Sequence, residues 1–143
     1  MLDLTPLLDS LEVEEGRKYK AYRDSRGILT IGDGFNIDPD HGGGLDDEEI
    51  NFILAHRVRK AQGFCEAFPW FDSLSDNRKY VIIDMMYNMG ESTFAQFHGT
   101  HAALAAGDYE KAADGMANSR WDSQVGKRAD RLERIMRSNV WES

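Results

Sequence analysis

Residues 14–34, EEGRKYKAYRDSRGILTIGDG, are the stretch of sequence that decides the fold. This stretch starts at the end of a leucine-rich segment whose apolar residues recur at helical spacing, which predicts a helix over residues 5–15. Thr5 is the expected N-cap, and Gly16 stands where a left-handed residue would end the helix. Glu15 is therefore expected in the last turn of this helix.

A β-hairpin is expected directly after the helix. The runs 19–24 and 28–34 are rich in aromatic and β-branched residues, and residues 25–27 (Ser-Arg-Gly) separate them as a turn. Asp24 is then the last residue of the first run, and Thr30 lies on the returning strand. The hairpin thus places a carboxylate and a hydroxyl next to the glutamate at the helix end.

Helical patterns account for most of the remaining chain. Asp46 with Glu49 forms a capping-box pattern that begins one helix after a breaker-rich loop. The run VIIDMMYNM belongs to a strongly apolar helix that ends at Gly90 and is expected at the centre of the core. The last helix has an apolar side formed by Ala129, Leu132, Ile135 and Met136. The helices expected after the Asp46 helix cover residues 75–90, 92–97, 100–106, 108–118 and 126–137.

These elements predict an α+β fold with a small lobe that contains the hairpin and a larger lobe that is all helix. We expect a single domain over residues 1–143, with the small lobe and its linking helix at about 16–60 and the helical lobe formed by 1–15 and 61–143. A chain of 143 residues can bury such a core unaided. Its single cysteine, Cys65, excludes an internal disulfide and is expected to be buried. A cleft between the lobes is the natural place for a ligand.

Charge and hydropathy exclude several classes of function. The net charge of −8 and pI near 4.9 argue against nucleic-acid binding. No apolar run approaches the roughly 20 residues that span a bilayer, and no signal-peptide pattern is present at the start, so we expect no membrane insertion and a cytoplasmic protein. Basic residues do gather near the C-terminus and could form a basic face toward an anionic polymer, in which case activity should fall as salt rises. They are Arg120, Lys127, Arg128, Arg131, Arg134 and Arg137.

Two neighbouring carboxylates, one protonated and one ionised, are the minimal machinery for glycoside hydrolysis. Glu15, at the partly negative end of a helix, suits the acid, and Asp24, beside Arg23 and Arg26, suits the group that stays ionised. The hydroxyl of Thr30 could hold a water. A solvated helix-end glutamate and an ordinary turn aspartate fit the same residues, so spacing alone leaves both interpretations open.

The segment EGRKYKAYRDSRGILTIGDG resembles the catalytic signature of the bacteriophage T4-type lysozymes, the glycoside hydrolase family 24 muramidases. That signature has a Glu-Gly, an Asp nine residues on, and a Thr-Ile-Gly-x-Gly run six further. The likeness continues over most of the chain, because DMMYNMGESTFAQF is similar to the family's central-helix motif and NSRWDSQVGKRADRL to its Ser-Arg-Trp and Arg-Ala motif. The resemblance implies a lysozyme-like fold with the active-site cleft between the two lobes.

The resemblance also implies roles for the three residues of the hairpin region. Glu15 would be the general acid, Asp24 the residue that positions or activates the attacking water, and Thr30 its partner in holding that water. The bond cut would be the β-1,4 link from N-acetylmuramic acid to N-acetylglucosamine, with inversion at the anomeric carbon.

Three further residues correspond to supporting positions of the family. Arg128 would pair with the catalytic glutamate, and Tyr87 and Asn88 would line the groove. Two positions depart from the family's pattern. Phe35 stands where a histidine is frequent, and Asp33 lies between the two glycines, where it would add a third negative charge if it faced the cleft.

Rival interpretations remain open at this point. The loop DPDHGGGLDDEE matches an EF-hand in part, with Asp38 first and Glu49 last, but Gly42 has no side-chain oxygen, and a turn before an acidic helix start explains the same residues. His98 and His101 are spaced as a zinc-dependent amidase could use them, yet a third ligand is missing, so we expect surface histidines. A peptidoglycan-binding module that keeps the fold and has lost its chemistry is the alternative without catalysis.

The resemblance implies bacterial peptidoglycan as the substrate of a monomeric enzyme without metal or cofactor. Two settings fit such an enzyme. One is an endolysin held in the host bacterial cytoplasm until it reaches the cell wall through a holin-type lesion, and the other is a virion-associated domain that penetrates the wall.

Overall fold

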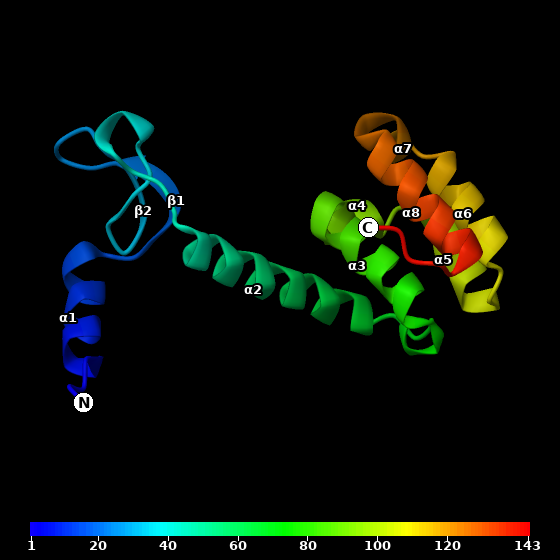
Figure 1. Cartoon of the computed structure of the whole chain (residues 1–143), viewed down its shortest axis with the longest axis horizontal. Helices are drawn as coiled ribbons and strands as arrows, with labels where there is room; N and C mark the ends of the chain where they lie inside the picture. Colours follow the sequence, from blue (N-terminus) through cyan, green and yellow to red (C-terminus); the bar gives the residue numbers. More distant parts are fainter. The chain divides into compact units, whose positions relative to one another are not determined.

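The computed structural model describes residues 1–143, and the chain divides into two units, unit 1 (residues 1–52) and unit 2 (residues 53–143). The architecture is α+β, as the sequence predicts, with a small antiparallel sheet in unit 1 and several helices in unit 2 (Figure 1). Helix α2 (Asp47–Glu66) begins in unit 1 and ends in unit 2.

Helix α1 (Thr5–Glu15) has the predicted extent and ends at Gly16, which is left-handed with φ 66°. The predicted N-cap is wrong. Leu4 occupies the cap position without a side-chain hydrogen bond, and Thr5 is the first helical residue. The N–H of Thr5 instead donates to Oδ1 of Asp3 at 3.0 Å, so an upstream carboxylate supplies the missing acceptor.

The predicted hairpin is present, and a third strand extends it. The second run was expected to continue through residue 34, but the chain turns at Asp33-Gly34, where Gly32 and Gly34 have φ values of 66° and 80°. The strand that follows has only two residues, which is too short to show an alternating pattern. The sheet is antiparallel in the order β1 (Lys18–Arg23), β2 (Leu29–Gly32) and β3 (Phe35–Asn36).

The loop after β3 is fastened by the buried side chain of Asp38. Its Oδ2 accepts the N–H of Leu29 at the start of β2 (3.0 Å), and its Oδ1 accepts the N–H of Asp40 (3.0 Å) in the 3-10 turn η1 (Pro39–His41). The hydrogen bond from Leu29 holds the pKa of Asp38 below its usual range. Asp38 therefore acts as a structural tie between strand and loop.

The start of α2 is the predicted capping box. The N–H of Glu49 donates to Oδ1 of Asp46 (2.8 Å), and the N–H of Asp46 donates to Oε1 of Glu49 (2.9 Å). The first and last carboxylates of the EF-hand-like loop, Asp38 and Glu49, thus both accept backbone N–H groups. These contacts support a turn followed by a capped helix.

The helices of unit 2 follow the predicted order, with one addition. Ser75 caps the central helix, accepting the N–H of Arg78, and Gly90 ends it, as expected. Helix α7 was missed because six residues are too few to show a helical period; Ser119 caps it by accepting the N–H of Asp122. None of the helices is both long and apolar enough to cross a bilayer. The elements after α2 are η2 (Phe71–Ser73), α3 (Asp76–Met89), α4 (Glu91–Phe94), α5 (His98–Ala106), α6 (Tyr109–Ala117), α7 (Arg120–Val125) and α8 (Lys127–Ser138).

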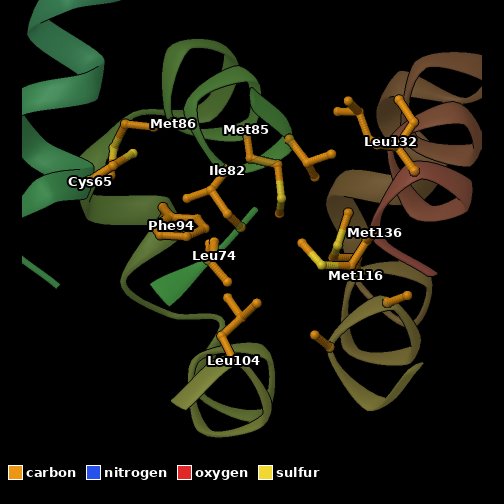
Figure 2. Packing of buried hydrophobic residues seen from close by; sticks show 14 of the residues in the cluster. Cys65, Leu74, Ile82, Met85, Met86, Phe94, Leu104, Met116, Leu132 and Met136 are labelled. Atoms are coloured by element: carbon orange, nitrogen blue, oxygen red, sulfur yellow. The ribbon is translucent and has the colours of Figure 1, made fainter. Parts of the chain in front are cut away.

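The hydrophobic core lies entirely within unit 2. Helix α3 supplies four buried side chains, and Figure 2 shows Ile82 beside Phe94 and Leu74, with Met85 on the side toward Leu132 and Met136 of α8. Cys65 is buried as predicted. In unit 1 only Thr30 and Asp38 are buried. The predicted inner side of α8 is fully buried, at 0% exposure for Ala129, Leu132, Ile135 and Met136.

Candidate active site

The three predicted catalytic residues all lie in unit 1. Glu15 is the last residue of α1, Asp24 follows β1, and Thr30 lies on β2. A Cβ placed on Gly34 would lie 2.7 Å from the carboxyl carbon of Glu15, so this glutamate lies directly against the Asp33-Gly34 turn. A side chain at position 34 would displace the carboxylate, and the positive φ there favours glycine as well. The second glycine of the Thr-Ile-Gly-x-Gly run is therefore needed to accommodate Glu15.

Asp24 is held by the backbone of the β1–β2 turn. Its Oδ1 accepts the N–H groups of Arg26 (2.8 Å) and Ile28 (2.9 Å). The hydrogen bond from Ile28 is the main reason that the pKa of Asp24 lies below its usual value. Asp24 is thus a turn residue, as one interpretation held, and also a fixed, ionised carboxylate. Because both bonds use Oδ1, Oδ2 can accept from a water or ligand.

The side chain of Thr30 is 4% exposed, and its hydroxyl donates to the carbonyl of Ile28 at 2.8 Å. A hydroxyl has one hydrogen to donate, and in Thr30 that hydrogen is committed to Ile28. Toward a bound water, Thr30 can therefore act only as an acceptor.

Both departures from the family pattern have local explanations. The carboxylate of Asp33 lies 3.0 Å from the guanidinium of Arg17, which also lies 3.3 Å from Glu12. The negative charge that we expected from Asp33 is therefore balanced. A Cβ placed on Gly32 would lie 2.7 Å from the ring of Phe35, which shows that the phenyl ring covers this glycine.

Arg128, in unit 2, is bound by a carboxylate that the sequence analysis missed. Its Nε and Nη2 both donate to Oδ1 of Asp84, at 2.8 and 2.5 Å. Asp84 is the single acid within the apolar run VIIDMMYNM, which was the available signal for such a partner. Arg128 and Tyr87 both line a hollow of about 600 Å³ in this unit, together with Trp141.

Asn88 is held by the indole of Trp121. The Nε1–H of Trp121, which is 4% exposed, donates to Oδ1 of Asn88 at 2.8 Å. Asn88 lines a second hollow of about 780 Å³, whereas its neighbour Tyr87 does not line it. The two predicted groove residues thus open into different hollows of unit 2.

The basic face expected near the C-terminus is largely neutralised. Four of its six cations have carboxylate partners within unit 2. Arg128 and Arg131 share Asp84, and the remaining pairs are Arg134 with Glu142 and Arg137 with Glu110 and Asp114. The sequence shows the clustered arginines but not these partners, most of which are distant along the chain.

The two histidines that suggested a zinc amidase do not act together. His98 is exposed, as predicted, but His101 is partly buried, which corrects the expectation of a surface residue. Its Nε2 lies 2.8 Å from the carbonyl oxygen of Phe94, and its ring packs against those of Phe68 and Trp70. These contacts give His101 a structural role.

The family model described as phage lysozyme matches residues 12–139, a range that contains every predicted catalytic and supporting residue. The chain belongs to the phage lysozyme family. A phage lysozyme is a glycoside hydrolase that acts on peptidoglycan, so the predicted enzyme class and substrate are confirmed.

Similar proteins include a T4-type lysozyme, a phage spike protein and a phage endolysin. The chain is 23% identical to probable T4-type lysozyme 2 of Dictyostelium discoideum, over 90% of this chain and 92% of the relative. It is 25% identical to pre-baseplate central spike protein Gp5 of Enterobacteria phage T4, over 96% of this chain but only 28% of the spike protein. It is 30% identical to the endolysin of Salmonella phage P22 over 59% of this chain and 61% of that endolysin.

Proposed function

We propose that this phage lysozyme cleaves the β-1,4 bond from N-acetylmuramic acid to N-acetylglucosamine with inversion, using Glu15 as acid and Asp24 with Thr30 to hold the attacking water. The main support is the contact of the Glu15 carboxylate with the Asp33-Gly34 turn. Through this contact one rigid hairpin positions the acid and also carries Asp24 and Thr30. An inverting glycosidase needs its two carboxylates fixed relative to each other with room for a water between.

The hydrogen bonds of Asp24 and Thr30 suit them to orient a water. Each side chain can only accept, because Asp24 is ionised and the hydrogen of Thr30 is donated to Ile28. A water that donates one hydrogen to each oxygen keeps its lone pairs for the anomeric carbon. Asp24 then takes the proton as the bond forms, which is the role of the general base.

Glu15 has the complementary role in this proposal. Its protonated carboxyl donates to the glycosidic oxygen while the water attacks from the opposite face of the sugar ring. The turn beside its carboxylate belongs to the hairpin that also carries Asp24 and Thr30, which favours a fixed spacing of the three groups.

We further propose that the enzyme acts as a monomer and that residues of unit 2 help to bind the sugar chain. Tyr87 and Asn88, which line hollows of this unit, are the proposed substrate-binding residues. Arg128 has a supporting role in this proposal, since its bonds to Asp84 use Nε and Nη2 and leave Nη1 for a further acceptor.

Turbidity clearing of permeabilised Gram-negative cells tests the assignment of the acid. The matched variants are Glu15→Gln and Glu14→Gln, which remove neighbouring exposed carboxylates from the same helix end. We expect Glu14→Gln to clear at the normal rate and Glu15→Gln to lose at least about 10²-fold in rate. Clearing by Glu15→Gln at the normal rate would disprove the assignment.

The products distinguish the reaction from its rivals. New muramic-acid reducing ends are expected, first as the α-anomer when products are followed by NMR within the first minutes. A first product that is the β-anomer would disprove inversion. Free amines in place of reducing ends would indicate amide hydrolysis.

We propose phage-mediated lysis of the host as the setting, with the enzyme held in the host cytoplasm until a holin-type lesion releases it. The likeness to the P22 endolysin supports this setting, and the likeness to the spike protein supports wall penetration by a virion as the alternative. Expression inside a bacterium should leave the culture turbid until the inner membrane is permeabilised. Purified virions that contain the chain would favour the alternative.

A further inference from the structure

The helical unit holds a group of three carboxylates that the proposed reaction does not use. This acidic cluster consists of Asp122 on α7 and Asp130 and Glu133 on α8, with one oxygen of each lying within 4.8 Å of the other two. Glu133 is only 9% exposed, and Asp130 is exposed. The cluster is therefore open to solvent at Asp130 and closed at Glu133.

Two oxygens of the cluster have no partner in the protein. Both Oδ1 of Asp122 and Oε1 of Glu133 are buried and accept no hydrogen bond. Ionised carboxylate oxygens can only accept, so neither can satisfy the other. A buried, unpaired charge of this kind is costly unless a cation or a proton lies between the two groups.

The arginines near the cluster are engaged elsewhere. Arg137 is bound to Glu110 and Asp114, and Arg134 is bound to Glu142. Their fields reach the cluster, but neither arginine donates a hydrogen bond to it. The charge of the cluster is therefore left to be balanced by a bound cation or by a proton.

We propose that the acidic cluster is a calcium site that ties α7 to α8. Three carboxylates provide only oxygen ligands, which favours a hard divalent cation over zinc. Ca–O bonds of about 2.3–2.6 Å let one Ca²⁺ bridge oxygens up to about 5 Å apart, whereas Mg²⁺ at about 2.1 Å reaches only about 4.2 Å. Waters entering beside Asp130 complete the 6 to 8 ligands that Ca²⁺ takes.

The site has a consequence for the groove. Trp121 directly precedes Asp122 on α7, and its indole holds Asn88. A cation that fixes Asp122 against α8 thereby fixes the helix that positions Asn88. The calcium site stabilises the helical unit and is separate from the residues that carry the proposed reaction.

The test compares thermal unfolding of the full chain at pH 8 in EDTA, in 10 mM CaCl₂, in 10 mM MgCl₂ and in NaCl of matched ionic strength. Calcium should raise Tm by about 5 °C or more over the NaCl control, with a Kd of about 10⁻⁴–10⁻³ M by calorimetry. Magnesium should raise it less. A calcium shift no larger than that in NaCl, or an equal shift with magnesium, would overturn the proposal.

Two variants locate the effect. Asp130→Asn removes the exposed ligand and should weaken calcium binding at least about tenfold, while Asp40→Asn removes an exposed carboxylate from the EF-hand-like loop and should leave binding unchanged. Terbium gives a second readout, because Trp121 beside the site should sensitise its emission, and Asp130→Asn should abolish that emission. Calcium binding that survives Asp130→Asn, or that Asp40→Asn removes, would refute the site.

Discussion

Replacing Gly115 by alanine should destabilise the helical unit, although the same change in an exposed helix normally stabilises. Gly115 lies in α6 where this helix meets α5, and a Cβ there would collide with Oγ1 of Thr100 and lie 3.3 Å from its backbone nitrogen. Thr100 is 1% exposed and its hydroxyl donates to the carbonyl of Ala112 at 3.3 Å. The threonine therefore has little room to move away from the new methyl group.

The two opposing effects can be given magnitudes. Alanine gains about 1 kcal/mol of helix propensity over glycine, and forcing a methyl group into a packed contact costs about 1–3 kcal/mol. The free energy of unfolding of Gly115→Ala should therefore fall by about 1 kcal/mol. Gly63→Ala is the matched control, because a Cβ at this exposed position in α2 meets nothing within 4 Å, and it should gain about 1 kcal/mol.

Urea unfolding followed by circular dichroism measures both changes. Combining Gly115→Ala with Thr100→Ala removes the colliding hydroxyl and should recover at least about 1 kcal/mol relative to the sum of the single changes. If Gly115→Ala stabilises the protein as much as Gly63→Ala does, the contact between α5 and α6 is looser than the structure indicates and the reasoning fails.

Three further predictions concern other parts of unit 2. Trp121→Phe removes the hydrogen bond to Asn88 and should lower the free energy of unfolding by about 1 kcal/mol in urea titrations; an unchanged midpoint would contradict this. Burial and the nearby Asp122 raise the pKa of Glu133 to about 8, so in EDTA stability should be full below pH 4.5 and fall as pH rises through 8. In Glu133→Gln the free energy of unfolding should no longer fall over this pH range. A variant with the same pH profile as the wild type would contradict the assignment to Glu133. Burial raises the pKa of the Cys65 thiol to about 12, so a thiol reagent should label it at pH 7 only after unfolding, and rapid labelling of the native protein would disprove the buried placement.

Elements with long or complete local signals could be predicted from the sequence. The helix from Ser75 to Gly90 has a cap at each end and an apolar run between them, and the structure contains it within one residue at each end. Strand β3 and helix α7 were missed because two and six residues carry too little periodicity. Their only signals were an Asp-Gly pair at residues 33–34 and a serine cap.

The candidate site could be proposed from the sequence because its three predicted catalytic residues lie in one continuous stretch. The contacts that hold the supporting residues could not be predicted, because they join residues far apart in the sequence, such as Arg128 and Asp84. Likewise Asp33 looked like an added negative charge until the structure placed it beside Arg17. The sequence alone predicts an ordinary helical residue at Glu133, because its burial depends on how α8 packs in the fold.

The confinement of the core to unit 2 bears on how the enzyme fails under heat. Unit 1, which carries the proposed acid, the proposed base and their threonine, buries no apolar side chain of its own and is held by polar ties such as that of Asp38. On heating, such a protein should lose activity at a lower temperature than its helical circular dichroism signal. Proteases should cleave it first among residues 1–52. Shelf life would then be limited by the part of the chain that carries the proposed catalytic residues, and engineering for durability should begin there.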